Sequence, residues 1–369
     1  MSGTQRLRVE LGPRSYDIVV GSGLLAHAGR ELAKVVRRPD VIIVTDSNLA
    51  ATGHLEILER SLSAAAIGWR RVVLPPGEAT KSMAQLGELL SALLDLGAER
   101  STTIVAFGGG VIGDLAGFAA AIALRGLDYA QVPTTLLAQV DSAIGGKTGI
   151  NTGHGKNLIG AFHQPRLVLA DTAVLASLSP RELRAGYAEV VKYGLIDRPD
   201  FFAWLESHGA QVLAGEPAAQ QHAILESCRA KAAVVAADER ETGARALLNL
   251  GHTFAHALEA ACGYGDELLH GEAVALGMVL AFDLSVRLGL CPADDALRVR
   301  AHLAAAGLPT TLRAVRAEGF AAGPLVAAMS RDKKTEGGRP RFVLTRGIGR
   351  AFTGGEVEPA ELEALFAAA

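Results

Sequence analysis

Residues Thr103–Asp114 read TIVAFGGGVIGD, a β-branched run that ends in three glycines and leads into an alanine-rich segment. The run Thr103–Phe107 predicts a buried strand, and Gly108–Asp114 predicts a turn that opens a helix. Glycines let a backbone approach a ligand closely, and a helix N-terminus offers amide donors with partial positive charge. The stretch therefore predicts a strand–turn–helix unit that binds a phosphate group. Its spacing differs from the usual Rossmann fingerprint, so a tight turn without a ligand is the alternative.

Two more strands are predicted before this stretch, and acidic or basic residues follow each of them. Val41–Asp46 ends in an acid, and Arg71–Leu74 is followed by a Pro-Pro-Gly turn that carries Glu78 and Lys81. Such alternation of strands and helices predicts a doubly wound, Rossmann-like α/β sheet with ligands at the carboxyl ends of its strands. Acids at these positions suit ribose hydroxyls, and a lysine suits a diphosphate or a ribose.

The β-branched runs disappear after about residue 175. Ser179, Pro180 and Glu182 form a helix start signal, and alanine- and leucine-rich helical segments continue to about residue 330. Arg341–Leu344 predicts one late, short strand. We therefore expect an α/β nucleotide-binding domain over residues 1–175 and a mainly α-helical domain over residues 176–369, with the active site between them.

The composition excludes several classes of partner. A formal net charge of −3 gives no basic face for nucleic acid. The longest purely apolar run, Ala273–Phe282, is far shorter than the roughly 20 residues that span a bilayer. The N-terminus lacks the apolar core of a signal peptide, and Cys228, Cys262 and Cys291 fit no metal or disulfide spacing. We expect a cytoplasmic protein with no nucleic-acid or membrane partner.

Lysine is rare among the 36 basic residues, and most lysines lie in glycine-rich turns or apolar runs. A compact, titratable ammonium cannot be replaced by the planar fork of arginine at every site. These positions predict one polar site that collects phosphate, carboxylate or hydroxyl groups, unless they reflect only a bias toward arginine. The residues are Lys81, Lys147, Lys156, Lys192, Lys231, Lys333 and Lys334.

A second polar region follows the glycine-rich stretch. Residues 133–148 read PTTLLAQVDSAIGGKT, and residues 155–157 read GKN. Hydroxyls, an acid and lysines on glycine-bearing turns predict a wall shared by a cofactor and a substrate, with solvated loops as the alternative. The candidates are Thr134, Thr135, Asp141, Lys147, Lys156 and Asn157.

A narrow polar stripe marks the helical half. Its members are spaced 4, 3, 4 and 3 residues apart, so we expect them on one face of a helix; they are Arg245, Asn249, His252, His256 and Glu259. Paired histidines at i, i+4 suit a metal, and His270 and Glu189 are further candidate ligands. Nitrogen and oxygen ligands without thiolate suit a catalytic Zn²⁺ or a similar ion. Spacing alone leaves His256 open as a fourth ligand, and single histidines could also be structural.

The ordered motifs GGGVIGD (108–114), PTTLL (133–137), GGKT (145–148), GKNLIG (155–160), NLGHT (249–253) and HGE (270–272) resemble the 3-dehydroquinate synthase family of sugar-phosphate cyclases. The resemblance runs from about residue 40 to residue 345. It implies NAD⁺, a zinc or cobalt ion and a homodimer. It also implies a lyase of the shikimate pathway that converts 3-deoxy-D-arabino-heptulosonate 7-phosphate to 3-dehydroquinate and phosphate. The implied route is transient oxidation, phosphate elimination, re-reduction, ring opening and intramolecular aldol closure.

The resemblance also implies residue roles. Glu189, His252 and His270 would hold the metal, whereas His256 would contact substrate and transfer protons. The other implied substrate residues are Lys147, Asn157, Lys192, Lys231, Arg245, Asn249 and Lys333, with Arg125 reaching the phosphate. The implied NAD⁺ residues are Asp46, Glu78, Lys81, Gly109, Gly110, Val111, Ile112, Gly113, Asp114, Thr134, Thr135, Lys147 and Lys156.

Three other functions fit parts of this pattern. A sister cyclase would make an aminated quinate or a C7 cyclitol, but His256, Asn249 and the basic pair in 332–334 favour a carboxylate-bearing substrate. A metal-dependent NAD polyol dehydrogenase would need no phosphate-collecting lysines. A non-catalytic dinucleotide sensor would need a broken site. Ala143 and Leu124 depart from the family pattern, which often has serine and methionine there.

Overall fold

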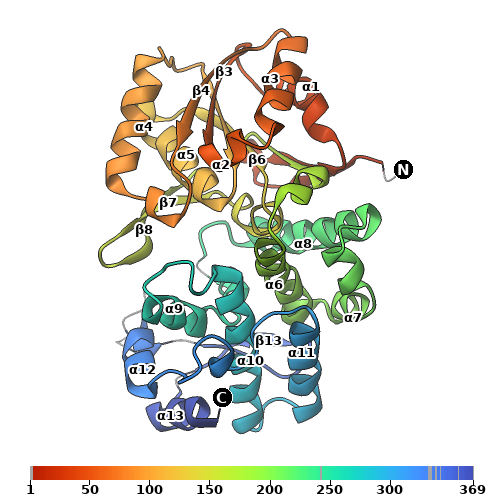
Figure 1. Ribbon diagram of the computed structural model, residues 1–369, viewed down its shortest axis with the longest axis vertical. Helices are drawn as coiled ribbons and strands as arrows, with labels where there is room; N and C mark the ends of the chain where they lie inside the picture. The colour runs from red at the N-terminus through yellow and green to blue at the C-terminus, as the bar shows by residue number, and fades with distance from the viewer. Residues whose placement is uncertain are drawn as a thin grey trace. The chain divides into compact units, whose positions relative to one another are not determined.

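The computed structural model describes residues 3–241, 243–330, 335–336, 339–340, 342–355 and 357–368. The chain divides into two compact units (Figure 1). The first contains Met1–Ser179 and Gly215–Arg240, and the second contains Pro180–Ala214 and Glu241–Ala369. The expected domain boundary near residue 175 stays a prediction. One segment beyond it, Gly215–Arg240, packs with the first unit.

A seven-stranded sheet forms the first unit. Its order is β1 (Gln5–Val9), β2 (Tyr16–Gly21), β9 (Leu167–Asp171), β6 (Asp128–Pro133), β5 (Thr103–Gly108), β3 (Asp40–Asp46) and β4 (Gly68–Leu74). β1 and β2 pair antiparallel, and all other neighbours pair in parallel. The strands predicted near residues 41, 71 and 103 are confirmed as β3, β4 and β5, whereas β1, β2, β6 and β9 were not predicted.

Helices cover both faces of this sheet (Figure 1). Val41 and Ile43 of β3 belong to one hydrophobic cluster with α1 (Ala28–Leu32) and α3 (His54–Ala64). Ile42 and Val44 belong to a second cluster with α4 (Met83–Asp95) and α5 (Gly110–Ile122). Because successive strand side chains point to opposite faces, a strand that is apolar throughout needs a helical layer on each side. The predicted doubly wound fold is confirmed.

Several further elements of the first unit carry or flank candidate site residues. These are the short α2 (Ser47–Ala50), a π-helical turn (Ala138–Ser142), the hairpin β7 (Lys147–Thr152) and β8 (Gly155–Phe162), and α8 (Pro217–Ala237). α8 packs on the π-helical turn and on β1, and β7 packs on α5. The polar residues predicted on loops at 147 and 155–157 therefore lie on strands.

Two glycines of α5 serve packing. A Cβ at Gly113 would lie 2.7 Å from Gln131 Oε1, and one at Gly117 would lie 2.5 Å from Thr148 Cγ2. Both positions therefore let α5 seat closely on β6 and β7. Part of the glycine cluster that suggested a ligand is explained by this contact between a helix and strands.

The second unit is mainly helical. It contains α6 (Pro180–Asp197), α7 (Pro199–Leu213), α9 (His252–Ala261), α10 (His270–Arg287), α11 (Ala293–Ala305), α12 (Ala322–Ser330) and α13 (Pro359–Ala368). Two small antiparallel pairs join β10 (Thr335–Glu336) with β11 (Arg339–Pro340) and β12 (Val343–Thr345) with β13 (Ala351–Thr353). The helix start at Pro180 is confirmed. The buried α10 packs against α6, α9 and α11.

One helix prediction is wrong. The stripe from Arg245 to Glu259 is not on one helix, because a 3₁₀ turn covers Ala244–Asn249 and α9 begins only at His252. Gly251 lies between them with a φ of 82°. Its backbone abuts α10, since a Cβ at Gly277 would lie 2.1 Å from the Gly251 carbonyl oxygen. The left-handed glycine redirects the chain, so periodicity across residue 251 carried no information about a shared face.

Among the residues that the structure describes, none of the helices is both long enough and apolar enough to traverse a membrane.

Candidate active site

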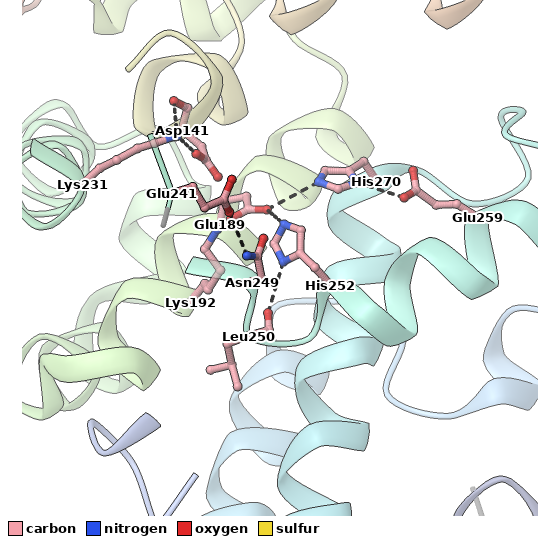
Figure 2. Close-up of polar contacts among 10 residues, drawn as sticks. All are labelled: Asp141, Glu189, Lys192, Lys231, Glu241, Asn249, Leu250, His252, Glu259 and His270. Carbon is pink, nitrogen blue, oxygen red and sulfur yellow. Dashed lines mark hydrogen bonds and ion pairs between the residues drawn. The ribbon is translucent and has the colours of Figure 1, made fainter. Parts of the chain in front are cut away.

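Glu189, His252 and His270 come together in the second unit (Figure 2). Glu189 lies on α6, and the two histidines are the first residues of α9 and α10. The Nε2 atoms of His252 and His270 each lie 3.6 Å from Glu189 Oε1. One possible ligand atom of each residue lies within 4.8 Å of the others. The three residues expected as metal ligands are thus placed to share one ion.

Close backbone packing sets this convergence. A Cβ at Gly271 would lie 1.8 Å from the carbonyl oxygen of Ala185, so only glycine lets α10 start so close to α6. Ala185 lies one helical turn before Glu189, which places His270 beside that carboxylate. The contact of Gly251 with Gly277 fixes the start of α9 in the same way.

An arginine also holds the first turn of α10. Arg181 Nε and Nη2 each donate to the Glu272 carboxylate at 2.7 Å. Glu272 Oε2 in turn accepts from the Leu269 backbone N–H at 2.8 Å. This pairing caps the helix that begins with His270. The position of that histidine therefore depends on side chains outside the ligand cluster.

The charges of the cluster fit a cation. Glu189 is fully buried, and Lys192 Nζ lies 2.5 Å from its Oε2. Burial alone would raise the pKa of Glu189, but the Lys192 ammonium and the two histidines hold this pKa well below its usual value. Neither carboxylate oxygen takes part in a hydrogen bond of normal geometry within the described residues. A buried oxygen without a hydrogen bond, beside two imidazole nitrogens, suits a divalent ion such as Zn²⁺.

Two carboxylates change the pKa of His270. Burial lowers its pKa, but Glu259 and Glu189 outweigh this effect and raise the pKa of His270 to about 9. In the absence of a metal, the cluster thus attracts a proton to the place where a cation would sit. Metal binding there would release that proton, because a ligating imidazole must be neutral.

His256 lies apart from the three converging residues. Its ring is 5.8 Å from the His252 ring and nearly perpendicular to it, one turn further along α9. Its nitrogens are not among the ligand atoms that converge. Of the two readings that spacing left open for His256, the geometry favours a role outside the ligand set.

Two further polar residues of the second unit lie on the 3₁₀ turn before α9. Arg245 is buried, and Asn249 Nδ2 donates to Glu241 Oε1 at 2.9 Å. Glu241 has a φ of 59° and was not predicted as a site residue. The sequence around Glu241 gives little indication of a site residue, because Glu241 lies in a charged stretch without periodicity. Lys333 and Lys334 lie outside the described residues.

Lys231 and Asp141 contact each other in the first unit (Figure 2). Lys231 lies on α8 and is buried, and its ammonium donates to the Asp141 carboxylate and, at 2.7 Å, to the Asp141 carbonyl oxygen. Gln139 anchors the π-helical turn that carries Asp141, since its Nε2 donates to the carbonyls of Pro133 and Asp171. The pair joins two residues that were predicted from separate patterns.

A second polar network of the first unit surrounds Lys81. This buried ammonium donates to Asp114 Oδ2 at 2.7 Å and to Asn157 Oδ1 at 2.5 Å. Lys156 Nζ lies 3.9 Å from Glu78 Oε1. These residues come from the β4–α4 loop, α5 and β8, so the structure brings together most of the charged residues that were predicted for the nucleotide.

Asn151 completes the network and was not predicted. Its Nδ2 donates to Glu78 Oε1 at 2.7 Å, and its Oδ1 accepts from the Asn157 backbone N–H at 3.0 Å. Asn157 has a φ of 55°, a conformation that asparagine tolerates better than most residues. Asn157 was predicted to contact the substrate, but its side chain accepts a hydrogen bond from Lys81, which was predicted to bind the nucleotide.

Other predicted nucleotide residues lie at strand ends. Asp46 is the last residue of β3, and its side chain accepts from the Leu49 backbone N–H at 2.9 Å, which caps α2. Thr134 follows β6, and Thr135 Oγ1 accepts from the Ala138 backbone N–H at 3.1 Å. At the start of α5, Gly109 provides no side-chain cap. Gly109 is thus the N-cap of a helix end without a side-chain cap, and the first residues of that helix are Gly110, Val111, Ile112 and Gly113.

Lys147 and Arg125 are exposed side chains of the first unit. Lys147 is the first residue of β7. Arg125 and the preceding Leu124 both have positive φ values, 68° and 48°. Two consecutive non-glycine residues in this conformation are strained, which is typical of functional segments.

Comparisons with known proteins place this geometry in a family. Family models described as 3-dehydroquinate synthase N-terminal and 3-dehydroquinate synthase C-terminal match residues 71–185 and 186–335. A 3-dehydroquinate synthase from Rhodospirillum rubrum is 63% identical over 364 residues, covering 98% of this chain and 94% of that protein.

Two solved structures extend the comparison to the fold. A 2-epi-5-epi-valiolone synthase from Streptomyces hygroscopicus subsp. jinggangensis 5008, with NAD⁺ and Zn²⁺ bound, has a TM-score of 0.87 at 31% identity, covering 100% of this chain and 98% of that one. A 2-deoxy-scyllo-inosose synthase complexed with carbaglucose-6-phosphate, NAD⁺ and Co²⁺ has a TM-score of 0.86 at 26% identity, covering 98% and 99%.

Proposed function

This chain belongs to the 3-dehydroquinate synthase family, and from that premise we propose how its own residues carry out the reaction. The enzyme is a phosphate-eliminating lyase of the shikimate pathway. It converts 3-deoxy-D-arabino-heptulosonate 7-phosphate to 3-dehydroquinate and phosphate through transient oxidation, elimination, re-reduction, ring opening and aldol closure. The observation that carries the proposal is the convergence of Glu189, His252 and His270, in a chain 63% identical to a 3-dehydroquinate synthase.

The cofactors are NAD⁺ and one divalent metal ion, Zn²⁺ or Co²⁺, as in the two solved relatives. When bound, NAD⁺ accepts and returns a hydride, and the metal acts as a Lewis acid on substrate hydroxyls. Glu189, His252 and His270 would hold the metal. In support, Glu189 Oε1 is buried, has no hydrogen bond in the described residues and faces two imidazole nitrogens.

Residues near the metal cluster would orient the substrate and move its protons. Lys192 keeps a buried positive charge that suits a developing oxyanion. His256 is half-buried, and we assign it transfer of a proton between its imidazole and a substrate oxygen. Arg245 and Asn249 would bind the carboxylate and a hydroxyl, since Glu241 already fixes the Asn249 amide.

The remaining substrate residues would hold charged groups of the sugar phosphate. We assign this role to Lys147, Lys231 with Asp141, Asn157, Lys333 and Arg125. Lys231 supports it best, because its buried ammonium is already fixed by Asp141. Fixed positive charges would stabilise the leaving phosphate and keep the substrate in one geometry.

NAD⁺ would occupy the carboxyl edge of the parallel sheet. The proposed contacts are Asp46, Glu78, Lys81, Gly109, Gly110, Val111, Ile112, Gly113, Asp114, Thr134, Thr135, Lys147 and Lys156. In support, the N-terminus of α5 lacks a side-chain cap, and its amides suit a pyrophosphate. We propose residues 1–175 as the NAD⁺-binding domain and residues 176–369 as the metal- and substrate-binding domain.

We further propose a cytoplasmic homodimer. Its subunit interface would involve the first unit, where Ile122 and Phe162 are exposed apolar side chains and Arg125 is strained. Cys228, Cys262 and Cys291 are free thiols, which suits a reducing compartment. Sedimentation of the purified protein at several concentrations tests the dimer; a monomer at all of them would contradict it.

Phosphate release from the heptulosonate phosphate tests the reaction. We expect sustained release that stops with a chelator and returns with Zn²⁺ or Co²⁺, while nicotinamide absorbance shows no net NADH. Net NADH from a simple polyol would instead favour a dehydrogenase. Phosphate release from an aminated or carboxylate-free sugar phosphate, but not from the heptulosonate phosphate, would favour a sister cyclase.

His270→Ala tests the metal cluster separately. We expect the variant to lose metal-dependent turnover, because one of three ligands is gone, and to bind NAD⁺ with unchanged affinity. Turnover is measured as phosphate release, and NAD⁺ binding by calorimetry. Wild-type activity in this variant would remove His270 from the ligand set.

A further inference from the structure

Glu259 is a buried carboxylate to which the proposed mechanism gives no role. It lies near the end of α9, two turns after His252, and only 1% of its surface is exposed. Burying a carboxylate costs free energy unless a charged or hydrogen-bonding partner compensates it. A neutral side chain of similar size could fill the same space without this cost. Packing alone therefore does not account for an acid at this position.

The Glu259 carboxylate contacts a proposed metal ligand (Figure 2). Its Oε2 lies 3.2 Å from His270 Nδ1. The other nitrogen of the same ring, Nε2, lies 3.6 Å from Glu189 Oε1. One imidazole thus bridges two buried carboxylates, with one edge toward Glu259 and the other toward the candidate metal centre.

This geometry specifies the tautomer of His270. An ionised carboxylate can only accept hydrogen bonds, so Nδ1 must carry the hydrogen and donate to Glu259. In the neutral ring the lone pair then lies on Nε2, the nitrogen that faces Glu189. A metal ligand needs a lone pair directed at the ion, and Glu259 selects the tautomer that supplies it.

His252 shows the same arrangement with a weaker acceptor. Its Nδ1 lies 3.3 Å from the carbonyl oxygen of Leu250, and its Nε2 lies 3.6 Å from Glu189 Oε1. Both rings therefore present Nε2 to the centre and have an acceptor behind Nδ1. The difference is that the acceptor behind His270 is charged, and charged acceptors make stronger hydrogen bonds.

We propose that Glu259 is a positioning residue of the metal centre, which fixes the tautomer and the ring orientation of His270 and thereby tightens metal binding. The inference rests on the proposed metal site at Glu189, His252 and His270. It assigns no contact between Glu259 and substrate or NAD⁺. Residues of this kind typically change metal affinity by about 10- to 100-fold when they are replaced.

Metal binding to Glu259→Gln and Glu259→Ala tests the proposal. The dissociation constants of Zn²⁺ and Co²⁺ are measured by competition with a chromophoric chelator, and the visible spectrum of the Co²⁺-saturated protein reports ligand geometry. We expect both constants to rise by about 10- to 100-fold, more for alanine than for glutamine, and the Co²⁺ spectrum to change. NAD⁺ affinity should stay unchanged. If Glu259→Ala does not fold, Glu259→Gln decides the question.

Glu267→Gln is the matched control. Glu267 lies in the same unit, is exposed and pairs with Arg316 rather than with a histidine. It should bind metal as wild type does. If wild type binds neither Zn²⁺ nor Co²⁺, the proposed metal site itself is wrong. If wild type binds metal and both Glu259 variants match its affinity and spectrum, the site stands and the positioning role of Glu259 is wrong.

Discussion

Buried lysines contact carboxylates in both units of the chain. Lys192 pairs with Glu189 in the second unit, and Lys231 pairs with Asp141 in the first. Isolated charges of this kind would be too costly to bury, and each pair lowers the cost for both members. A buried ion pair of this kind holds a charged group in a fixed position, where a ligand could bind it. Both lysines predicted in apolar surroundings thus lie in such pairs, and their role in a functional site stays a prediction.

Lys231→Ala is expected to impair catalysis more than folding. Removal of the ammonium leaves Asp141 unpaired and takes away a positive charge proposed to face the substrate. Turnover should fall by about 100-fold, and the free energy of unfolding by about 1–3 kcal/mol. Phosphate release and urea unfolding measure the two effects. Lys34→Ala, which removes an exposed lysine paired with Glu31, should change neither, and near-wild-type turnover of Lys231→Ala would contradict its assignment.

Residue chemistry predicted charged candidate residues in apolar or glycine-rich runs better than polar residues without such surroundings. Lys81, Asp114 and Glu189 stand out in the sequence, because a charge in an apolar or glycine-rich run needs an explanation. Asn151 and Glu241 were missed, since their roles arise only from contacts with Glu78, Asn157 and Asn249. These contacts lie within a hairpin, between that hairpin and a loop, or within a turn, and no periodic spacing in the sequence encodes them.

At the level of helices, close backbone contacts position the candidate ligands. Gly271 brings the start of α10 against α6, and Gly251 with Gly277 brings the start of α9 against α10. The helical periodicity of residues 245–259 failed because Gly251 ends the pattern with a left-handed turn. A periodic pattern predicts a shared face only for residues of one continuous helix. The sequence did not show that Gly251 ends the helix, because a glycine can also lie within a helix.

Gly271→Ala is expected to disturb the metal centre through the helix contact. The added methyl group would overlap the Ala185 carbonyl, so α10 must shift away from α6 and carry His270 with it. The free energy of unfolding should fall by about 1–3 kcal/mol, and metal affinity should weaken. Urea unfolding and chelator competition measure these effects.

Gly87→Ala is the control for this substitution. Gly87 lies inside α4, and a Cβ there would meet no atom within 4 Å. Alanine should therefore raise the free energy of unfolding by about 0.5–1 kcal/mol. If Gly271→Ala instead behaved like Gly87→Ala in both measurements, the contact with Ala185 would not position His270.

Over the whole molecule, the alternation of strands and helices predicted the layered sheet of the first unit. It did not predict which unit every helix belongs to. Alternation of strands and helices was enough for the doubly wound sheet, because strands buried on both faces are apolar throughout. It was not enough for α8, a helix from the middle of the chain that packs on β1 and on the turn that carries Asp141. A helix packs with the unit whose surface fits its own side chains, and that surface can come from residues far away in the sequence. The periodicity within the helix does not show which unit this is.

A pH dependence of stability should arise in both units. His163 in the first unit and His302 in the second have lowered pKa values, in each case mainly because of burial. The Leu127 carbonyl and Glu206 oppose this shift without cancelling it. Both imidazoles have partly buried contacts, since His163 Nε2 lies 2.8 Å from Leu127 O and Tyr187 Oη lies 3.0 Å from His302 Nε2.

The sign of this dependence follows from proton binding. In the unfolded chain both histidines titrate near pH 6.5, whereas in the folded protein they take up protons only at lower pH. The unfolded state therefore binds more protons as the pH falls below about 6.5, and the free energy of unfolding decreases with it. Above this pH both states are neutral at these groups, and stability should not depend on them. Urea unfolding at pH 7.5, 6.5 and 5.5 measures the effect, and His302→Gln isolates one histidine by difference. A variant with the same loss of stability between pH 7.5 and 5.5 as wild type would contradict the assignment, because the substitution removes the titrating group and leaves an amide that can still contact Tyr187.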